Sequence, residues 1–302
     1  MLGLLVLILT APQFTPQNRV LAEVPIELVG NKTVVPVMVG SSGPFRLILD
    51  TGMAYDGILL FDSARVDVSQ FDEIVGVRVP GAGSGSASHA LSDSSETISV
   101  GPLRFEGQRV TILTGSGFRG YPTDGVIGYS LLGHYAVEID YDRNRMILYE
   151  PSTFAPGSEW ESIDIYFKDN QIPWIDISLV TEDEDPVRLA TYVDFASSDA
   201  LELLERETNV FTLPSETEEK YAGRGLSGDI HGKEGRVSKV VLGTQVLRDV
   251  TAMVVPAAVR SRQGGADGII GNDLLRRFNV TFDYAHSKIH LKPNEHRSEP
   301  FK

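Results

Sequence analysis

Short apolar runs bounded by Gly, Ser and Pro recur along the chain, and this pattern is typical of β-strands. The first half predicts strands at Val34–Val39 and Arg46–Leu49. The second half predicts more of them, at Trp174–Val180, Val187–Val193, Val237–Leu242, Val250–Val255 and Lys288–Leu291. Helical patterns are short and lie at Ser198–Arg206, Asn272–Phe278 and Ser130–His134. We therefore predict an all-β protein with few short helices.

The chain also repeats itself at a nearly constant offset. Asp124–Gly128 (DGVIG) recurs as Asp267–Gly271 (DGIIG), 143 residues later. Val137–Tyr141 (VEIDY) recurs as Val280–Tyr284 (VTFDY) at the same offset. Similarities in one order and at one offset predict two tandem copies of one unit. The stretch Pro151–Trp160 is the candidate linker, so we expect one lobe over residues 23–152 and another over 153–302.

Composition excludes several kinds of chemistry. The 302 residues contain no cysteine, which removes disulfides, thiol nucleophiles and thiolate zinc sites. The net charge of −14 disfavours nucleic-acid binding, because an acidic surface repels phosphates. Its six histidines are scattered, and its glycine-rich GxGxxG stretches precede no long helix. We therefore expect no metal, no cofactor and no nucleic-acid partner.

The N-terminus carries an apolar segment of a different kind. Met1–Leu9 is too short to span a bilayer, which needs about 20 residues, but it suits the core of a signal peptide. Val20 and Ala22 have the spacing of a signal-peptidase site, although no basic residue precedes the apolar core. We predict a signal peptide or short membrane anchor over residues 1–22, with export to the periplasm or extracellular space and no stable membrane span.

One motif carries candidate chemistry in each copy. In the first copy an apolar strand delivers Asp50, Thr51 and Gly52 into a turn, and an apolar strand ends at Gly128 further along. The second copy has Asp194-Phe195-Ala196-Ser197 after an equivalent strand, and its glycine strand ends at Gly271. A strand that ends at the aspartate fixes its backbone, and the glycine allows another backbone to approach closely.

With these motifs the chain resembles the pepsin/retropepsin-like aspartic peptidases, in the bacterial single-chain form with two duplicated lobes. The resemblance covers about Val24 to Pro293 and implies two pseudo-symmetric β-barrel lobes. It also implies that Asp50 and Asp194 form the catalytic pair, and that the chain is an endopeptidase acting on peptides or proteins as a monomer. Two nearby carboxylates retain one proton between them, so one can activate water while the other donates to the scissile carbonyl.

The second loop departs from the family pattern. Phe195 and Ala196 stand where the family has a hydroxyl residue and a glycine, and Phe195 cannot make the hydroxyl contact that joins the two loops. Met53 replaces a serine that bonds the carboxylate in pepsins, whereas Ser197 keeps that option in the second copy. Gly128 and Gly271 are expected to be architectural. The resemblance leaves open whether the Asp194 loop is catalytically competent.

The sequence also indicates which segments could cover the cleft, and it leaves two other functions open. The Gly- and Ser-rich region Val79–Val100 lies where the family has its flap and predicts a mobile loop, with Tyr221–Gly235 as its counterpart. A catalytically impaired peptide- or ligand-binding protein on the same fold is the alternative function. A third possibility is an enzyme in which the first copy dimerises through its own Asp-Thr-Gly loop, although duplication makes this unnecessary.

Overall fold

The computed structural model describes residues 18–66, 71, 73–168, 171–182, 185–260 and 264–301. Most of the predicted leader, residues 1–17, lies outside these ranges, so the leader and export stay predictions. Val20–Ala22 already belongs to strand β1, and Ala22 is buried, so cleavage after Ala22 would shorten this strand. Within the described ranges, no helix is long and apolar enough to cross a membrane.

The first half of the chain builds an eight-stranded sheet that closes on itself through an additional β3–β7 pairing. Neighbouring strands follow the order β2 (Glu27–Val29), β3 (Lys32–Val39), β4 (Ser42–Leu49), β9 (Gly125–Ile127), β5 (Gly57–Leu60), β8 (Leu103–Leu113), β7 (Ser88–Val100) and β6 (Val75–Val79). The β4–β9 and β5–β8 pairs are parallel. We call this sheet with its connections the first lobe.

The second half repeats that topology strand for strand, closed by β14–β18, and forms the second lobe. Its order is β13 (Tyr166–Phe167), β14 (Pro173–Val180), β15 (Val187–Val193), β20 (Gly268–Ile270), β16 (Leu201–Glu205), β19 (Gln245–Pro256), β18 (Gly228–Leu242) and β17 (Thr217–Gly225). The β15–β20 and β16–β19 pairs are again parallel. The predicted all-β fold with two β-barrel lobes is confirmed; the lobe boundaries near residue 152 stay a prediction.

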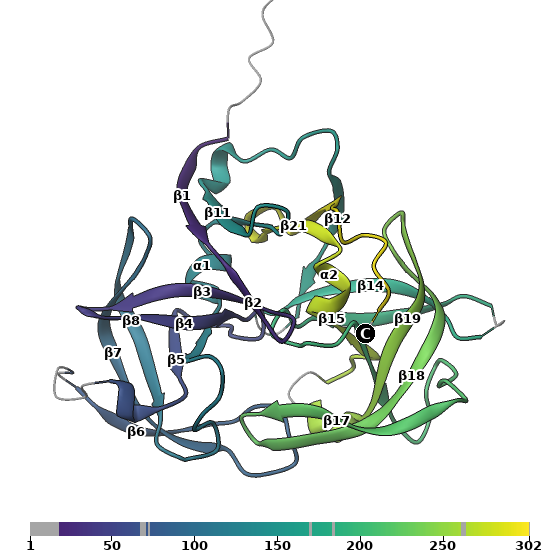
Figure 1. The fold of residues 1–302 in the computed structure, drawn as a ribbon, viewed down its shortest axis with the longest axis horizontal. Coiled ribbons are helices and arrows are strands. Elements are labelled where there is room, and N and C mark those ends of the chain that lie inside the picture. Colours follow the sequence, from purple (N-terminus) through teal and green to yellow (C-terminus); the bar gives the residue numbers. More distant parts are fainter. Residues whose placement is uncertain are drawn as a thin grey trace, which may run out of the picture.

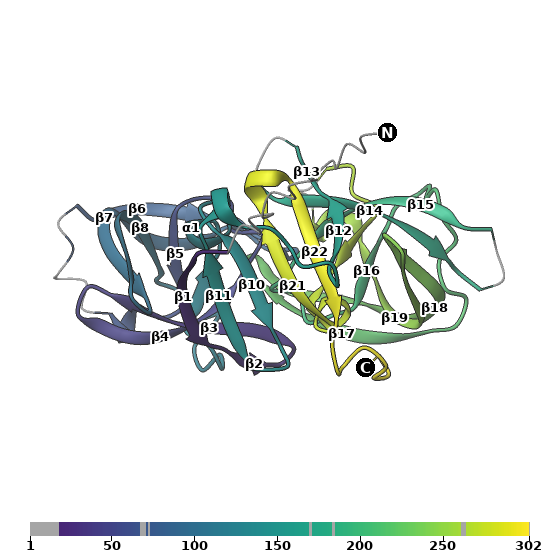
Figure 2. The same cartoon turned by 90° about the horizontal axis from the view of Figure 1, so that it is seen from above.

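A six-stranded sheet joins the two halves (Figure 1). It follows the order β1 (Val20–Pro25), β11 (Arg145–Tyr149), β10 (Ala136–Asp140), β21 (Phe278–Asp283), β22 (Lys288–Pro293) and β12 (Glu161–Asp164). Strands β10 and β21 come from different halves and pair side by side at its centre (Figure 2). One hydrophobic core runs from this sheet into both lobes, so the halves share packing as well as hydrogen bonds.

Helices are short, as predicted, but one helix prediction is wrong. Among the described residues, the α-helices are α1 (Tyr129–Leu132) and α2 (Asn272–Leu275), supplemented by 3-10 turns η1 (Ser63–Arg65), η3 (Pro151–Thr153), η4 (Ala257–Arg260) and η5 (Tyr284–His286). Residues Leu201–Glu205, predicted to be helical, form strand β16. Four consecutive residues of this strand are buried, and β19 and β20 pair with it on both sides. Burial on all sides favours a central strand over a one-sided helix.

Candidate active site

The two predicted aspartates end equivalent strands of the two lobes. Asp50 follows β4, and its backbone N–H donates to the carbonyl of Ile127 at 2.8 Å. Asp194 follows β15, and its N–H donates to the carbonyl of Ile270 at 2.9 Å. The register repeats as well, because Leu49 pairs with Ile127 as Val193 pairs with Ile270. The structure therefore places both aspartates at one kind of strand end, on opposite sides of the lobe interface.

The glycines after these partner strands make room for the aspartate loops. A Cβ on Gly128 would lie 2.2 Å from the carbonyl oxygen of Asp50. A Cβ on Gly271 would lie 2.2 Å from the carbonyl oxygen of Asp199. Both distances are far inside van der Waals contact, so any side chain would displace the loop. This close approach accounts for glycine at both predicted positions.

The carboxylates are held by matching backbone contacts. Gly52 N–H donates to Asp50 Oδ1 at 2.7 Å, and Ala196 N–H donates to Asp194 Oδ1 at 3.1 Å. Ala196 therefore keeps the contact that the glycine makes in the first copy. Its side chain packs against an apolar cluster of the first lobe that contains Phe61.

One hydroxyl makes the crossing contact between the loops. Thr51 Oγ1 donates to the carbonyl of Val193 at 2.6 Å and accepts from the Phe195 N–H at 2.9 Å. Phe195 has no hydroxyl to make the reciprocal contact, as the sequence indicated. Its ring is fully buried and packs edge-on against Phe282 of β21 at 5.2 Å. Thr51 thus joins the two loops through polar contacts, and aromatic packing holds Phe195 of the second loop against the six-stranded sheet.

A second group of hydrogen bonds joins the lobes beside Asp194. Lys32 Nζ donates to Ser198 Oγ, which donates to the carbonyl of Gly30 at 2.6 Å. Asn31 Nδ2 donates to the carbonyl of Ser198 at 3.2 Å. The β2–β3 hairpin of the first lobe therefore holds the segment that follows the Asp194 loop.

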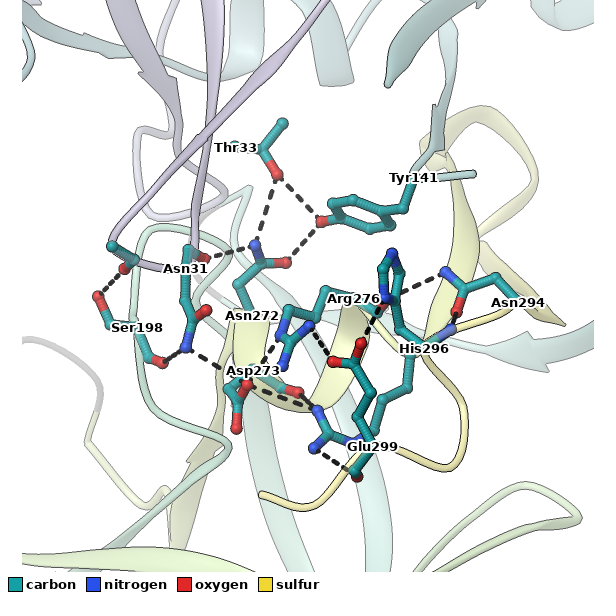
Figure 3. A network of polar contacts seen from close by, with 12 residues as sticks. Asn31, Thr33, Tyr141, Ser198, Asn272, Asp273, Arg276, Asn294, His296 and Glu299 are labelled. Carbon is teal, nitrogen blue, oxygen red and sulfur yellow. Dashed lines mark hydrogen bonds and ion pairs between the residues drawn. The ribbon is translucent and has the colours of Figure 1, made fainter. Parts of the chain in front are cut away.

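The same hairpin reaches α2 through a polar network (Figure 3). Asn272 Nδ2 donates to the carbonyl of Asn31 at 2.6 Å, and Tyr141 O–H donates to Asn272 Oδ1 at 2.7 Å. Thr33 lies 3.0 Å from the Tyr141 hydroxyl. These contacts bring together β3, the end of β10 and α2. They hold α2 of the second half against the β2–β3 hairpin of the first lobe.

Ser197 does not play the role that the sequence suggested for it. Its hydroxyl donates to Glu202 Oε1 at 3.1 Å instead of to the Asp194 carboxylate. Glu202 is only 2% exposed, and a buried carboxylate needs donors around it. In the first copy, buried Met53 occupies the equivalent position and supplies no side-chain donor.

Three charged residues near the two aspartates were not predicted. Arg260 at the end of η4 donates to Glu202 through Nε at 3.0 Å and through a second guanidinium nitrogen. Its remaining nitrogen lies 3.7 Å from Asp194 Oδ2. Lys32 also lines the cavity, and burial lowers its pKa although the charges of nearby carboxylates act to raise it. Glu202 carried the one usable signal, because it is a charged residue inside the otherwise apolar stretch Ala200–Leu204.

Burial and charge perturb the titration of the site. Burial raises the pKa of Asp50 to about 7, and the negative charge of Asp194 adds to this rise. The Gly52 N–H, Arg260 and Lys32 oppose the rise but do not cancel it. A carboxyl with a raised pKa beside a second carboxylate is an arrangement that is common in acid–base sites.

Both aspartates line one cavity of about 430 Å³ between the lobes. Apolar side chains flank it on both sides: Ile48, Phe61, Phe118, Tyr121 and Val126 from the first lobe, and Ile172, Tyr192, Ile230 and Val259 from the second. The rings of Phe61 and Phe118 stack with their centroids 4.5 Å apart and form an aromatic surface on the first-lobe side. The cavity therefore combines a carboxylate pair with apolar surfaces on either side.

Two hairpins meet across the cavity, opposite the six-stranded sheet (Figure 1). Gly85 N–H, beyond β6, donates to the carbonyl of Ser227 at 2.6 Å, and Ser227 N–H donates to the carbonyl of Ala82 at 2.9 Å. A Cβ on Gly225 would lie 2.2 Å from the Ala82 oxygen, so the close approach requires glycine. Only part of the expected mobile loop is a loop, since residues 88–100 form the long strand β7. We call the contact between residues 80–88 and 224–228 the roof.

Comparison with known proteins supports the fold. No protein-family model matches the chain, and no curated protein sequence matches it. Among solved structures, the crystal structure of an aspartic proteinase from Irpex lacteus is similar, with a TM-score of 0.58. The match covers 93% of this chain and 99% of that one, at 15% sequence identity. At that identity the likeness concerns the fold, which is that of a pepsin-like aspartic proteinase.

Proposed function

We propose that this chain is an aspartic-type endopeptidase that hydrolyses peptide bonds in the cavity between its lobes. The observation that carries the proposal is the placement of Asp50 and Asp194. They end equivalent strands, are tied together through Thr51, and line one cavity. The whole-chain fold likeness to an aspartic proteinase supports the same reading.

The reaction uses one water and one shared proton. The ionised carboxylate takes a proton from the water, and the water oxygen bonds to the scissile carbonyl carbon. At the same time the protonated carboxyl gives its proton to the carbonyl oxygen. The resulting gem-diol collapses as the C–N bond breaks. The leaving nitrogen takes the proton held by the first carboxylate, and a diol hydroxyl returns its proton to the second. The dyad ends with the single proton with which it began.

The surroundings of the dyad favour a peptide substrate. Apolar walls on both sides of the carboxylates suit apolar side chains flanking the cleaved bond. The roof lies across the cavity, and we propose that the two hairpins move apart when a chain segment binds. Because one chain supplies both aspartates, the site needs no second copy, and we propose that the protein acts as a monomer.

The test is cleavage of an unstructured protein substrate, followed by mass spectrometry across pH 3 to 8. Asp50→Asn and Asp194→Asn should each abolish cleavage, because either change removes one of the two acid–base groups. Asp249→Asn is the matched control, since this aspartate is exposed on the second lobe and pairs with Arg236 outside the cavity. Undiminished cleavage in Asp194→Asn would refute the paired mechanism.

A non-catalytic peptide-binding protein is the second candidate. It is favoured by Phe195, which leaves one loop without its crossing hydroxyl, and by Arg260, which lies beside one member of the dyad. A statine inhibitor, which mimics the tetrahedral intermediate, separates the two functions. Binding of statine with cleavage supports the enzyme, whereas binding of peptides without cleavage at any pH supports the binding protein.

A further inference from the structure

The two aspartates of the dyad have different charged neighbours. Asp194 Oδ2 lies 3.7 Å from the guanidinium of Arg260, whose side chain is 13% exposed. Among the described residues, no ion pair joins Arg260 to Asp50. The resolved polar contact of the Asp50 carboxylate is the neutral Gly52 N–H at 2.7 Å. The surroundings of the two carboxylates are therefore not equivalent.

The position of Arg260 is set by its other contacts. Two of its nitrogens bind Glu202, which also accepts from the hydroxyl of Ser197. This two-point contact orients the planar guanidinium and leaves its third nitrogen facing Asp194. Arginine is not deprotonated in proteins, so its positive charge does not depend on pH over the range of the titration.

The remaining titratable groups around the dyad do not remove this inequality. Lys32 of β3 interacts with the charges of both aspartates as well as with those of Asp199 and Glu202, so it does not distinguish Asp50 from Asp194. Tyr192 of β15 is buried close by and also interacts with both aspartates. The Lys32 ammonium is held on Ser198 Oγ.

On the Asp50 side, the hydroxyl of Tyr284 is buried and close enough for its ionisation to be opposed by the Asp50 charge. A neutral phenol supplies no countercharge to a carboxylate. Over the described part of the chain, the ion pair of Arg260 with Asp194 therefore has no equivalent at Asp50.

We infer that Arg260 is a positioning residue that keeps the negative charge of the dyad on Asp194 and leaves the shared proton on Asp50. The consequence for roles rests on the proposed peptidase function. Asp194 is then the base that takes the proton of the water, and Asp50 is the acid that donates to the carbonyl oxygen. The rise in the Asp50 pKa to about 7 agrees with this assignment, because a raised pKa favours the protonated form of Asp50.

Carboxyl titration by ¹³C NMR tests the inference without using activity. The full chain is labelled at the aspartate side-chain carbonyl, and the resonances of Asp50 and Asp194 are assigned from the Asp50→Asn and Asp194→Asn variants. Of these two resonances in the wild type, the one with a step near neutral pH should be that of Asp50. Asp199, whose pKa burial also raises to about 7, contributes a separate resonance that neither variant removes. A neutral-pH step at Asp194 instead would overturn the inference, and this result does not depend on any further variant folding.

Two variants test the part played by Arg260. Arg260→Met combined with Glu202→Gln removes both charges together, and the neutral-pH step should then be divided between the two carboxyl resonances. Arg260→Lys keeps the cation and should retain the wild-type pattern. Removal of an exposed pair of the same lobe, through Arg188→Met with Asp176→Asn, is the matched control and should also retain it. An unaltered pattern in the Arg260→Met/Glu202→Gln protein refutes the inference.

Cleavage kinetics provide an independent readout. In the charge-removed variant, the acid limb of the kcat/KM profile should move upward by about one pH unit or more, because a cation no longer favours ionisation of its neighbour. If peptides are not cleaved by any form, the proposed function fails, while the NMR titration still decides where the proton resides. The two failures are therefore distinguishable.

Discussion

Replacing Asp50 by asparagine should stabilise the protein at alkaline pH and leave its stability nearly unchanged in acid. Asparagine has the same shape, and its oxygen can still accept from the Gly52 N–H. The difference between the two side chains is the proton that Asp50 holds. Between about pH 4 and pH 7 the folded chain binds this proton while the unfolded chain has released it, so wild-type stability falls as the pH rises through that window.

The magnitude follows from the size of the pKa rise. The Asp50 pKa is raised from 3.8 to about 7, and one unit corresponds to about 1.36 kcal/mol of unfolding free energy. The full rise would amount to about 4 kcal/mol. Because Asp50 is partly exposed, water screens part of this cost, and about 2 to 4 kcal/mol is expected. Asparagine bears no such cost at any pH.

Urea unfolding of both proteins at pH 4 and pH 8 measures the effect. At each pH, the unfolding free energy of the wild type is subtracted from that of the variant. The change of this difference between pH 4 and pH 8 is the useful quantity, because pH-independent effects of the substitution cancel in it. Asp249→Asn serves as control, since an exposed carboxylate should show little of this dependence. If the difference between wild type and Asp50→Asn is the same at both pH values, Asp50 does not retain its proton and the electrostatic argument is wrong.

Two further substitutions probe the lobe interface and the roof. Thr51→Val leaves the Phe195 N–H and the Val193 carbonyl without their partner. Chemical denaturation should therefore show a loss of about 2 to 4 kcal/mol in unfolding free energy, and cleavage should fall by about 100-fold. Wild-type stability in this variant would contradict the crossing contact. Gly225→Val places side-chain atoms against the Ala82 carbonyl, so peptide KM should rise with little change in thermal midpoint, and an unaltered KM would show that roof contact is not needed for binding.

Much of the scaffold could be predicted because repetition and alternation are local signals. The offset between Asp124–Gly128 and Asp267–Gly271 indicated two equivalent units, and the structure places the two segments at matching positions of two closed sheets. The segment Leu201–Glu205 was misread as a helix because its apolar residues satisfy a helical spacing. Its actual form depends on β19 and β20, which are distant in the sequence.

The site was predictable in part for the same reason. The positions of Asp50 and Asp194 followed from the motif at each strand end, and the one-sided contact of Thr51 followed from the missing hydroxyl at residue 195. Arg260 could not be found in this way, because no spacing relates it to Glu202, 58 residues earlier. Charges that meet only through tertiary packing leave no periodic signal in the sequence.

The pairing of β10 with β21 has a consequence for how this site can change. Glu138 lies opposite Thr281, and these two positions are separated by 143 residues, which is also the offset of the repeat. Strands β10 and β21 are the equivalent strands of the two repeats, and equivalent positions pair with each other. This is the register that two identical subunits would form about a two-fold axis. In such a dimer every substitution would occur twice. Here a single fused chain breaks that symmetry, so an arginine can form an ion pair with one aspartate and, among the described residues, has no counterpart paired with the other.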